Sequence, residues 1–319
     1  MRRRQQGVAL ITIMLIVVVA TVLSVQMASE QNIAVNRTAS LFSNYHAEQY
    51  AYGGEELARQ ILHASFKEHP AVDALTDTWA SPNLSYAFDN GEVKLTIEDL
   101  QSRLNVNTEA NSLERSRLYS LASAIGVDGM FIDRIVDWVD ADGSKTNIGA
   151  EDYDYLGLER PYRTAGSPMV DESELRLLFE MTDEAYGKLA RYVAPVPEVV
   201  KVNVNTASAL VIKSLSNNIT MEMAEGIVAQ RESNGKFANL QAFLDALPQG
   251  TDLNPDGLGV QSSFFRVSVL ARYYDRYAYL TSVIQRDPSD GSMRVIYRDL
   301  GKKIAAAVVE VAAPEVDNG

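Results

Sequence analysis

The sequence contains no cysteine, which excludes a disulfide scaffold, a thiolate metal site, an iron–sulfur cluster and a cysteine nucleophile. Histidine is scarce: His46, His63 and His69 are scattered and form neither a zinc-binding H-E-x-x-H motif nor an evident Ser-His-Asp set. Positive charge is limited, because 29 Lys and Arg face 42 Asp and Glu, for a net charge of −13. That balance disfavours binding to nucleic acid and suits a cationic partner such as calcium.

A long hydrophobic run stands out in an otherwise ordinary globular composition of 319 residues, a length that suggests about two domains. The run extends from Val8 to Val25, and no charged residue occurs between Arg4 and Glu30. At about 1.5 Å per residue it spans the roughly 30 Å hydrocarbon core of a bilayer. Because three arginines precede it, the positive-inside rule predicts a single-pass membrane protein whose bulk lies on the side of the membrane opposite the cytoplasm.

Gly7 lies where the charged start of the chain meets the hydrophobic run, and this junction has three competing interpretations. A cleaved secretory signal would end in small residues of the A-x-A type, which residues 25–28 fit poorly. A plain signal anchor would need only the hydrophobic run. In the third interpretation Gly7 itself matters, because the junction resembles the leader of type IV prepilins and pseudopilins, which is cut after such a glycine.

This resemblance implies that prepilin peptidase cleaves between Gly7 and Val8 and methylates the new amino terminus at Val8. Most pilin-like proteins carry Glu at the fifth residue of the mature chain, where this chain has Thr12 in its assembly helix. The missing Glu is characteristic of the minor pseudopilin K family of type II secretion, which the chain resembles. In pilins this Glu is thought to pair with the amino terminus of the next subunit, so Thr12 implies that no subunit sits above this one.

The rest of the chain divides into a long helix, two groups of strands and a helical block between the groups. Helical spacing without proline predicts one helix from 28 to about 66, with an irregularity at Gly53-Gly54. Alternating apolar and β-branched residues predict strands over 84–88, 92–99, 264–273, 277–285 and 293–299. Because these strands flank a mostly helical block, we expect a split sheet with an inserted domain.

The helical block contains a short internal repeat. Leu104-Asn-Val-Asn-Thr108 recurs as Val202-Asn-Val-Asn-Thr206, and a helical segment follows each copy. Because Asn and Thr are good N-cap residues, we interpret both copies as capped helix starts. The second copy continues in a pattern similar to helix-hairpin-helix modules, but its turn at 216–218 has no glycine to approach a phosphate. We therefore predict a packing module and no nucleic-acid partner.

Six carboxylates lie within eighteen residues, and they suggest a calcium loop. They are Asp137, Asp140, Asp142, Glu151, Asp152 and Asp154. Calcium takes 6–8 oxygen ligands, and a loop that gathers carboxylates needs such a cation to offset their repulsion. An EF-hand starting at Asp140 would need glycine at its sixth position, where the chain has Lys145. An irregular calcium site and a merely solvated acidic loop both remain open from the residues alone.

Segment 137–176 looks very much like the corresponding part of the minor pseudopilin K family, whose members bind calcium there. The resemblance carries the metal-ligand role to Asp140, Asp142, Glu151, Asp152 and Asp154. It implies an α+β fold, in which an N-terminal transmembrane helix continues into a pilin-like α/β body with an antiparallel sheet, interrupted by a large all-helical inserted domain. The expected parts are a leader at 1–7, a transmembrane helix at 8–28, body at 29–104 and 263–312, a two-lobed insert at 105–262 (second lobe from about 202), and a flexible tail at 313–319.

The resemblance also implies a function without catalysis. A minor pseudopilin K would cap the pseudopilus tip and help to initiate its assembly for export of folded proteins across the outer membrane. It would form a tip complex with I-like and J-like minor pseudopilins, followed by an H-like and the major pseudopilin. The alternative is a membrane-anchored periplasmic acidic-site hydrolase, in which one carboxylate is kept protonated as an acid beside an ionised base.

Overall fold

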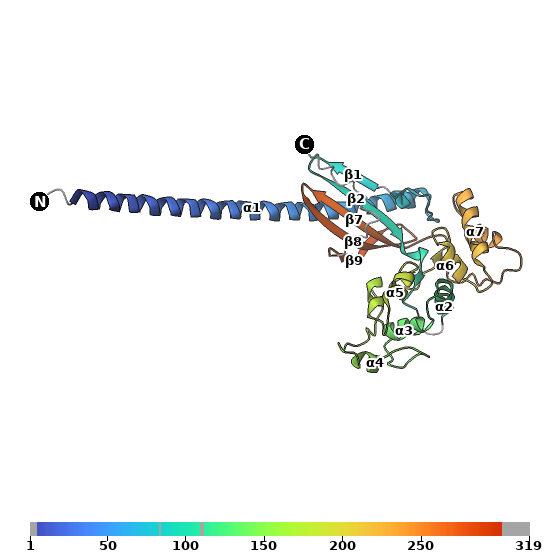
Figure 1. The fold of residues 1–319 in the computed structure, drawn as a ribbon. Helices are drawn as coiled ribbons and strands as arrows, with labels where there is room; N and C mark the ends of the chain where they lie inside the picture. The colour runs from blue at the N-terminus through green and yellow to red at the C-terminus, as the bar shows by residue number, and fades with distance from the viewer. Residues whose placement is uncertain (1–4, 83, 109–111, 302–319) are drawn as a thin grey trace.

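A single long helix leads into the body of the molecule. The computed structural model describes residues 5–82, 84–108 and 112–301, and α1 spans Gln5–Glu68 (Figure 1). The first proline is Pro70, so nothing in the segment removes a helical hydrogen bond. The part of α1 from Ala9 is long and apolar enough to cross a membrane, and its most apolar window is not buried against the rest of the molecule.

The helix is continuous through Gly53-Gly54, so the expected irregularity there is wrong. The two glycines have different surroundings. A Cβ on Gly53 would meet nothing within 4 Å, whereas a Cβ on Gly54 would lie 2.6 Å from Val269 Cγ1 and 2.8 Å from Val93 Cγ1. Gly54 therefore allows α1 to approach the sheet closely, and the tertiary contact outweighs the low helix propensity of glycine.

This pair of neighbouring glycines gives a matched test of the contact between helix and sheet. We expect Gly53→Ala to raise the free energy of unfolding by about 0.5–1 kcal/mol, because alanine is the better helix former. Gly54→Ala should instead lower it by about 1–3 kcal/mol, because the methyl group overlaps two valine side chains. Chemical denaturation of the full chain in detergent measures both; equal effects of the two substitutions would contradict the close packing.

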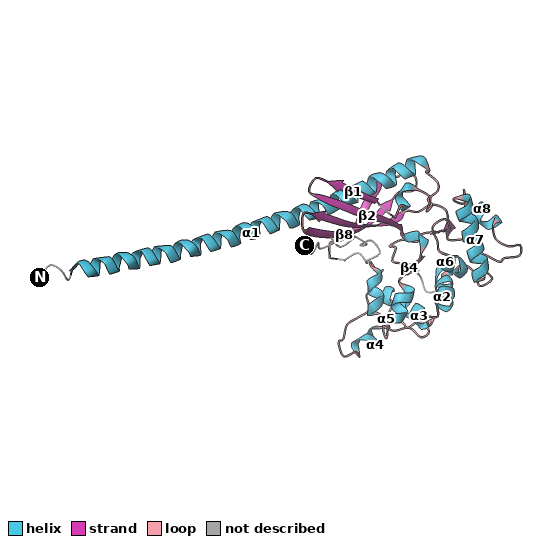
Figure 2. Cartoon of the chain, turned by 45° about the horizontal axis from the view of Figure 1, so that its top comes forward, coloured by secondary structure: helices cyan, strands magenta, loops and turns pink. Residues whose placement is uncertain are grey.

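The body contains one five-stranded antiparallel sheet in the order β1-β2-β7-β8-β9. Its strands are β1 Leu84–Phe88, β2 Gly91–Asp99, β7 Phe264–Tyr273, β8 Arg276–Arg286 and β9 Met293–Asp299, and all five expected strands are confirmed. The central pair joins the two halves of the body, with Leu95 opposite Val269. Small residues of α1, among them Ala47, Ala51 and Ala58, bury against this sheet (Figure 2).

Helices dominate the chain between β2 and β7, and the α+β class is confirmed. They are α2 Leu113–Ile125, α3 Met130–Val139, α4 Asp152–Leu156, α5 Asp183–Leu189, α6 Ala209–Ser214, α7 Met221–Asn234 and α8 Leu240–Asp245. The expectation of an all-helical insert needs correction, because it contains two short parallel strand pairs. β3 Leu104–Asn105 pairs with β4 Val193–Ala194, and β5 Val202–Asn203 pairs with β6 Leu258–Gly259. Runs of two residues carry too little alternation for a sequence pattern to reveal them.

The Asn-x-Asn-Thr copies do not cap helices, so that interpretation is wrong. The N-caps of α2 and α6 are Ser112 and Ser208 instead. In each copy the second asparagine holds the backbone of a distant residue through both amide atoms. Asn107 accepts the Met169 N–H at 2.8 Å and donates to its carbonyl at 3.0 Å, and Asn205 binds Phe237 in the same way at 2.8 and 2.9 Å.

The equivalent contacts show that the insert contains one structural module twice. Each module has a short strand, the asparagine contact and two helices. A short capped helix follows the residue that the asparagine contacts, which is Met169 in the first module and Phe237 in the second. In the second module only residues 235–236 separate α7 from Phe237, whereas in the first module residues 140–168 separate α3 from Met169. The acidic segment is therefore a long insertion into one of two copies of the module.

Candidate metal centre in the acidic loop

The acidic loop, residues 140–168, follows α3 and contains α4. It lies on a part of the insert far from the free end of α1 (Figures 1 and 2). Oxygen atoms of Asp140, Asp142 and Glu151 all lie within 4.8 Å of one another. Asp140 Oδ1 and Glu151 Oε1 are buried and have no hydrogen-bond partner among the residues that the structure describes. Buried carboxylate oxygens without donors are unfavourable, so this arrangement fits a hard divalent cation that accepts oxygen ligands.

The protonation equilibria of the cluster reflect burial and mutual repulsion. Burial raises the pKa of Glu151 to about 7, and the negative charges of Asp137 and Asp140 act in the same direction. Burial also raises the pKa of Asp140, together with the charge of Asp142. A divalent cation would reverse this balance, because it stabilises the ionised form of every carboxylate that it contacts.

The other two expected ligands, Asp152 and Asp154, form ion pairs with basic side chains. Asp152 pairs with Arg163 at 2.7 Å, and Asp154 pairs with Lys145 at 2.7 Å. Asp154 also accepts the Glu151 N–H at 2.9 Å, and thereby helps to start α4. The pKa of each aspartate is lowered, for Asp152 mainly by hydrogen bonds from Thr164 and for Asp154 by Lys145. The structure therefore groups three of the five residues, and a ligand role for Asp152 and Asp154 stays a prediction.

Aromatic side chains form the base of the acidic loop. The ring of Trp138 contacts Tyr155 at 5.4 Å between centroids, and Tyr155 contacts Tyr162 at 5.4 Å and Phe179 at 5.9 Å. Tyr155 is fully buried and its hydroxyl accepts the Phe179 N–H at 3.0 Å. Sequence reasoning missed this support, although a tryptophan between two aspartates was a visible signal. Trp138 is therefore placed to report on the loop by fluorescence.

The residues expected to take part in processing lie at the other end of the molecule. Gly7, Val8 and Thr12 all belong to α1, which continues without a break across this junction. The expected leader residues 1–4 and the chain from 302, which includes the end of the second body part and the tail at 313–319, lie outside the described residues. Cleavage after Gly7 and methylation of Val8 stay predictions.

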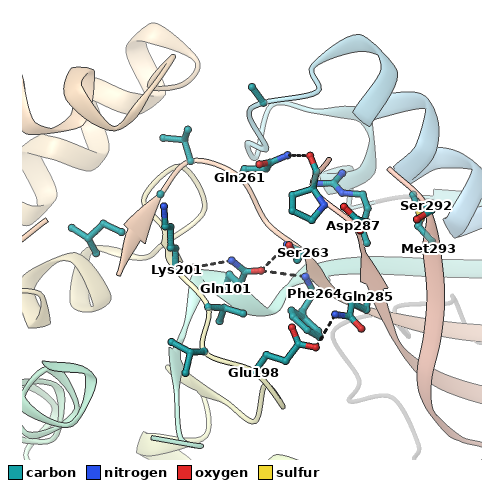
Figure 3. Close-up of a pocket in the computed structure, with 18 of the residues that line it drawn as sticks. Gln101, Glu198, Lys201, Gln261, Ser263, Phe264, Gln285, Asp287, Ser292 and Met293 are labelled. Atoms are coloured by element: carbon teal, nitrogen blue, oxygen red, sulfur yellow. Dashed lines mark hydrogen bonds between the residues drawn. The ribbon is translucent and has the colours of Figure 1, made fainter. Parts of the chain in front are cut away.

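A cleft of about 890 Å³ lies between the linker that joins the two modules and the ends of β7, β8 and β9 (Figure 3). Gln101 spans it, donating to the Lys201 carbonyl at 2.7 Å and accepting the Ser263 N–H at 2.6 Å. Its carboxylates are engaged: Glu198 accepts from Gln285, and hydrogen bonds from Ser289 lower the pKa of Asp287. A lowered pKa is the opposite of what a general acid needs, so Asp287 does not supply the protonated acid of the hydrolase alternative.

Comparison with known proteins connects this architecture to a family. Family models described as type II secretion system protein K match residues 93–198 and 202–261. Type II secretion system protein K of Pseudomonas aeruginosa is 34% identical over 95% of each chain, and that of Pectobacterium carotovorum is 29% identical over 94% of this chain and 98% of the other. A chain in the crystal structure of the GspK-GspI-GspJ complex from the enterotoxigenic Escherichia coli type 2 secretion system superposes with a TM-score of 0.73. At 24% identity the match covers 84% of this chain and 100% of the other.

The long apolar helix, the sheet that it packs on and the modular insert define an α+β protein with a pilin-like body. The chain belongs to the type II secretion system protein K family. It is thus a minor pseudopilin of that system, and the hydrolase alternative is not favoured.

Proposed function

We propose that this minor pseudopilin caps the pseudopilus tip and helps to initiate its assembly for export of folded proteins across the outer membrane. The single observation that carries the proposal is the position of the insert. It lies beyond the end of the sheet, opposite the free part of α1 (Figure 1). A subunit stacked on that end would collide with the insert, and Thr12 offers no carboxylate to the amino terminus of such a subunit.

The route to the tip begins in the inner membrane. The free part of α1 anchors the chain there by one pass, with the body in the periplasm. Prepilin peptidase cleaves after Gly7 and methylates Val8. I-like and J-like minor pseudopilins, the partners of the related protein in its crystallised complex, are the first to join, and an H-like and the major pseudopilin follow. We propose no enzymatic activity, because the family acts as a secretion component.

The tip position is tested by locating the protein on filaments. In a strain that assembles pseudopili, an epitope tag on the exposed loop at 248–252 can be labelled with antibody-coated gold. We expect label at one end of each filament, and loss of secretion of a reporter exoprotein when the chain is deleted. Label along the filament length would contradict the tip assignment, even if secretion still required the protein.

We further propose that Asp140, Asp142 and Glu151 bind calcium, with Asp152 and Asp154 acting mainly as supports of the loop. The observation that supports this is the pair of buried oxygens without donors, Asp140 Oδ1 and Glu151 Oε1. Calcium would supply positive charge that offsets the repulsion among the three carboxylates. The acidic loop is an insertion into a module that also occurs without it, so its order depends more on this ion than the order of the rest of the insert does.

Calcium addition gives the corresponding prediction. For the full chain in detergent, calcium at about 100 times its dissociation constant should stabilise the folded state by about 2.7 kcal/mol, or about 5–10 °C in Tm. A change in Trp138 fluorescence should accompany binding, measured in a Trp79→Phe background. Glu151→Gln should abolish both effects, and Glu159→Gln, at an exposed carboxylate of the same segment, should abolish neither. A folded wild-type chain without a Tm shift would refute the metal site.

A further inference from the structure

A fourth carboxylate lies three residues before the proposed ligand Asp140. Asp137 belongs to α3 and is fully buried, with 0% of its surface exposed. Both of its oxygens face the Thr146 N–H, Oδ1 at 3.0 Å and Oδ2 at 3.2 Å. Among the described residues, its oxygens are not part of the group formed by Asp140, Asp142 and Glu151.

The neighbouring buried carboxylate on α3 has a different environment. Asp133, one turn earlier, forms an ion pair with Arg115 and accepts from the Tyr119 hydroxyl. In the described part of the chain no lysine or arginine pairs with Asp137, which instead holds a piece of loop backbone. Asp137 is bound by the backbone and the side chain of one residue, Thr146. A buried carboxylate without a cationic partner contributes little net stability, so its position calls for another explanation.

Gly149 provides the second observation. A Cβ built on Gly149 would lie 1.8 Å from Asp137 Oδ2 and 2.6 Å from its Cγ. The φ of Gly149 is not in the left-handed region, so the close approach to Asp137, rather than backbone conformation, requires glycine here. The Gly149 N–H also donates to the Thr146 carbonyl at 2.8 Å, which closes the segment 146–149 into a turn against Asp137.

The turn determines where the candidate ligand Glu151 lies. Ala150, between Gly149 and Glu151, is 1% exposed and packs in the core of the insert. Glu151 follows it directly. One of its oxygens lies in the cluster with Asp140 and Asp142, and its Oε1 is buried without a donor among the described residues. The backbone of residues 146–150, just before Glu151, is therefore held at three points: by the hydrogen bond at Thr146, by the close approach at Gly149 and by the buried methyl group of Ala150.

We propose that Asp137 is a positioning residue of the cation site, which holds the 146–149 turn against α3 so that Glu151 faces Asp140 and Asp142 before the ion arrives. The inference rests on the cation site proposed above. Groups that orient ligands without touching the metal typically change metal affinity by 10–100-fold when they are removed. Asp137 would act on the ion only through the loop, and Gly149 would be the position that permits it.

The test compares Asp137→Ala, Asp137→Asn and Gly149→Ala in the full chain in detergent. Isothermal titration with calcium chloride should show a 10–100-fold loss of affinity for Asp137→Ala and Gly149→Ala, with the stoichiometry unchanged. The Asp137→Asn variant keeps an oxygen that accepts the Thr146 N–H, so its loss should be clearly smaller. Gly187→Ala, where a Cβ meets nothing within 4 Å, is the matched control and should bind like the wild type.

Hydrogen exchange without calcium separates positioning from ligation. In chelator, the Thr146 amide should exchange faster in Asp137→Ala than in the wild type and in Asp137→Asn. Equal losses of affinity in Asp137→Ala and Asp137→Asn, with Thr146 exchange unchanged in both, would make Asp137 a ligand and overturn the proposal. Wild-type affinity in Asp137→Ala would overturn it too. If the wild type itself bound no calcium, the cation site would fail first, which is a distinguishable result.

Discussion

Replacement of Arg286 by methionine is expected to lower the free energy of unfolding by about 3–5 kcal/mol, since it leaves a buried carboxylate without its partner. Arg286 ends β8, is 1% exposed and pairs with the equally buried Asp73, which follows α1. The guanidinium also donates to the Ser262 carbonyl at 2.6 Å and lies between the rings of Phe66 and Phe265. One side chain therefore joins α1, the loop after it, and the beginning and end of the strand pair β7–β8.

Two further variants make this first prediction specific. Asp73→Asn added to Arg286→Met removes the uncompensated charge and should recover at least about 1 kcal/mol of the loss. Lys188→Met breaks the solvent-exposed pair with Glu184 on α5 and should cost no more than about 0.5 kcal/mol. Chemical denaturation of the full chain measures all three. A similar small loss for Arg286→Met and Lys188→Met would show that the buried pair does not hold the junction.

The second large effect is expected from pH, through Asp99 at the end of β2. Its carboxylate is 2% exposed and accepts the Gln101 N–H, the hydroxyls of Thr206 and Ser262 and the Asn203 amide. Burial raises the pKa of Asp99 to about 6, although the hydrogen bonds from Thr206 and Ser262 act in the opposite direction. The folded state therefore binds a proton more tightly at Asp99 than the unfolded state does.

The sign of the pH effect follows from linkage. A pKa raised from about 4 to about 6 gives stability that is fully present below about pH 4 and is lost as pH rises to about 6, by about 3 kcal/mol. Asp99→Asn cannot titrate, so the unfolding free energy of the wild type minus that of the variant should fall by this amount between about pH 3.5 and 7. A difference that stayed constant or rose with pH would mean that the four donors keep Asp99 ionised in the folded state.

The same junction explains why the asparagine repeat was misinterpreted. Asn203 donates to Asp99, to Ser262 and to the Asp73 carbonyl, residues that lie 59 to 130 positions away in the sequence. A local pattern predicts capping because Asn and Thr favour helix starts. The partners that bind these asparagines are remote in the sequence, so the spacing could not predict them. For the same reason it could not predict that the motif connects the insert to the sheet.

The sequence by itself determined the features that depend on neighbours along the chain. The hydrophobic run after Arg4, the Pro-free helix and the alternating strands that flank the insert follow from composition and period, and so does the concentration of carboxylates after α3. Hydrophobic burial and backbone hydrogen bonding act on such periodic patterns directly, which is why the strands were placed within about a residue or two.

Only the tertiary structure decided which of those carboxylates meet and which pair elsewhere. Asp140, Asp142 and Glu151 converge, whereas Asp152 and Asp154 are drawn into ion pairs with Arg163 and Lys145. The tertiary structure also decided the role of Gly54, because this glycine lets α1 approach two valines on strands that are distant in the sequence. Side-chain convergence depends on how elements pack across long sequence separations, and electrostatic and steric effects act on those distances rather than on positions in the chain.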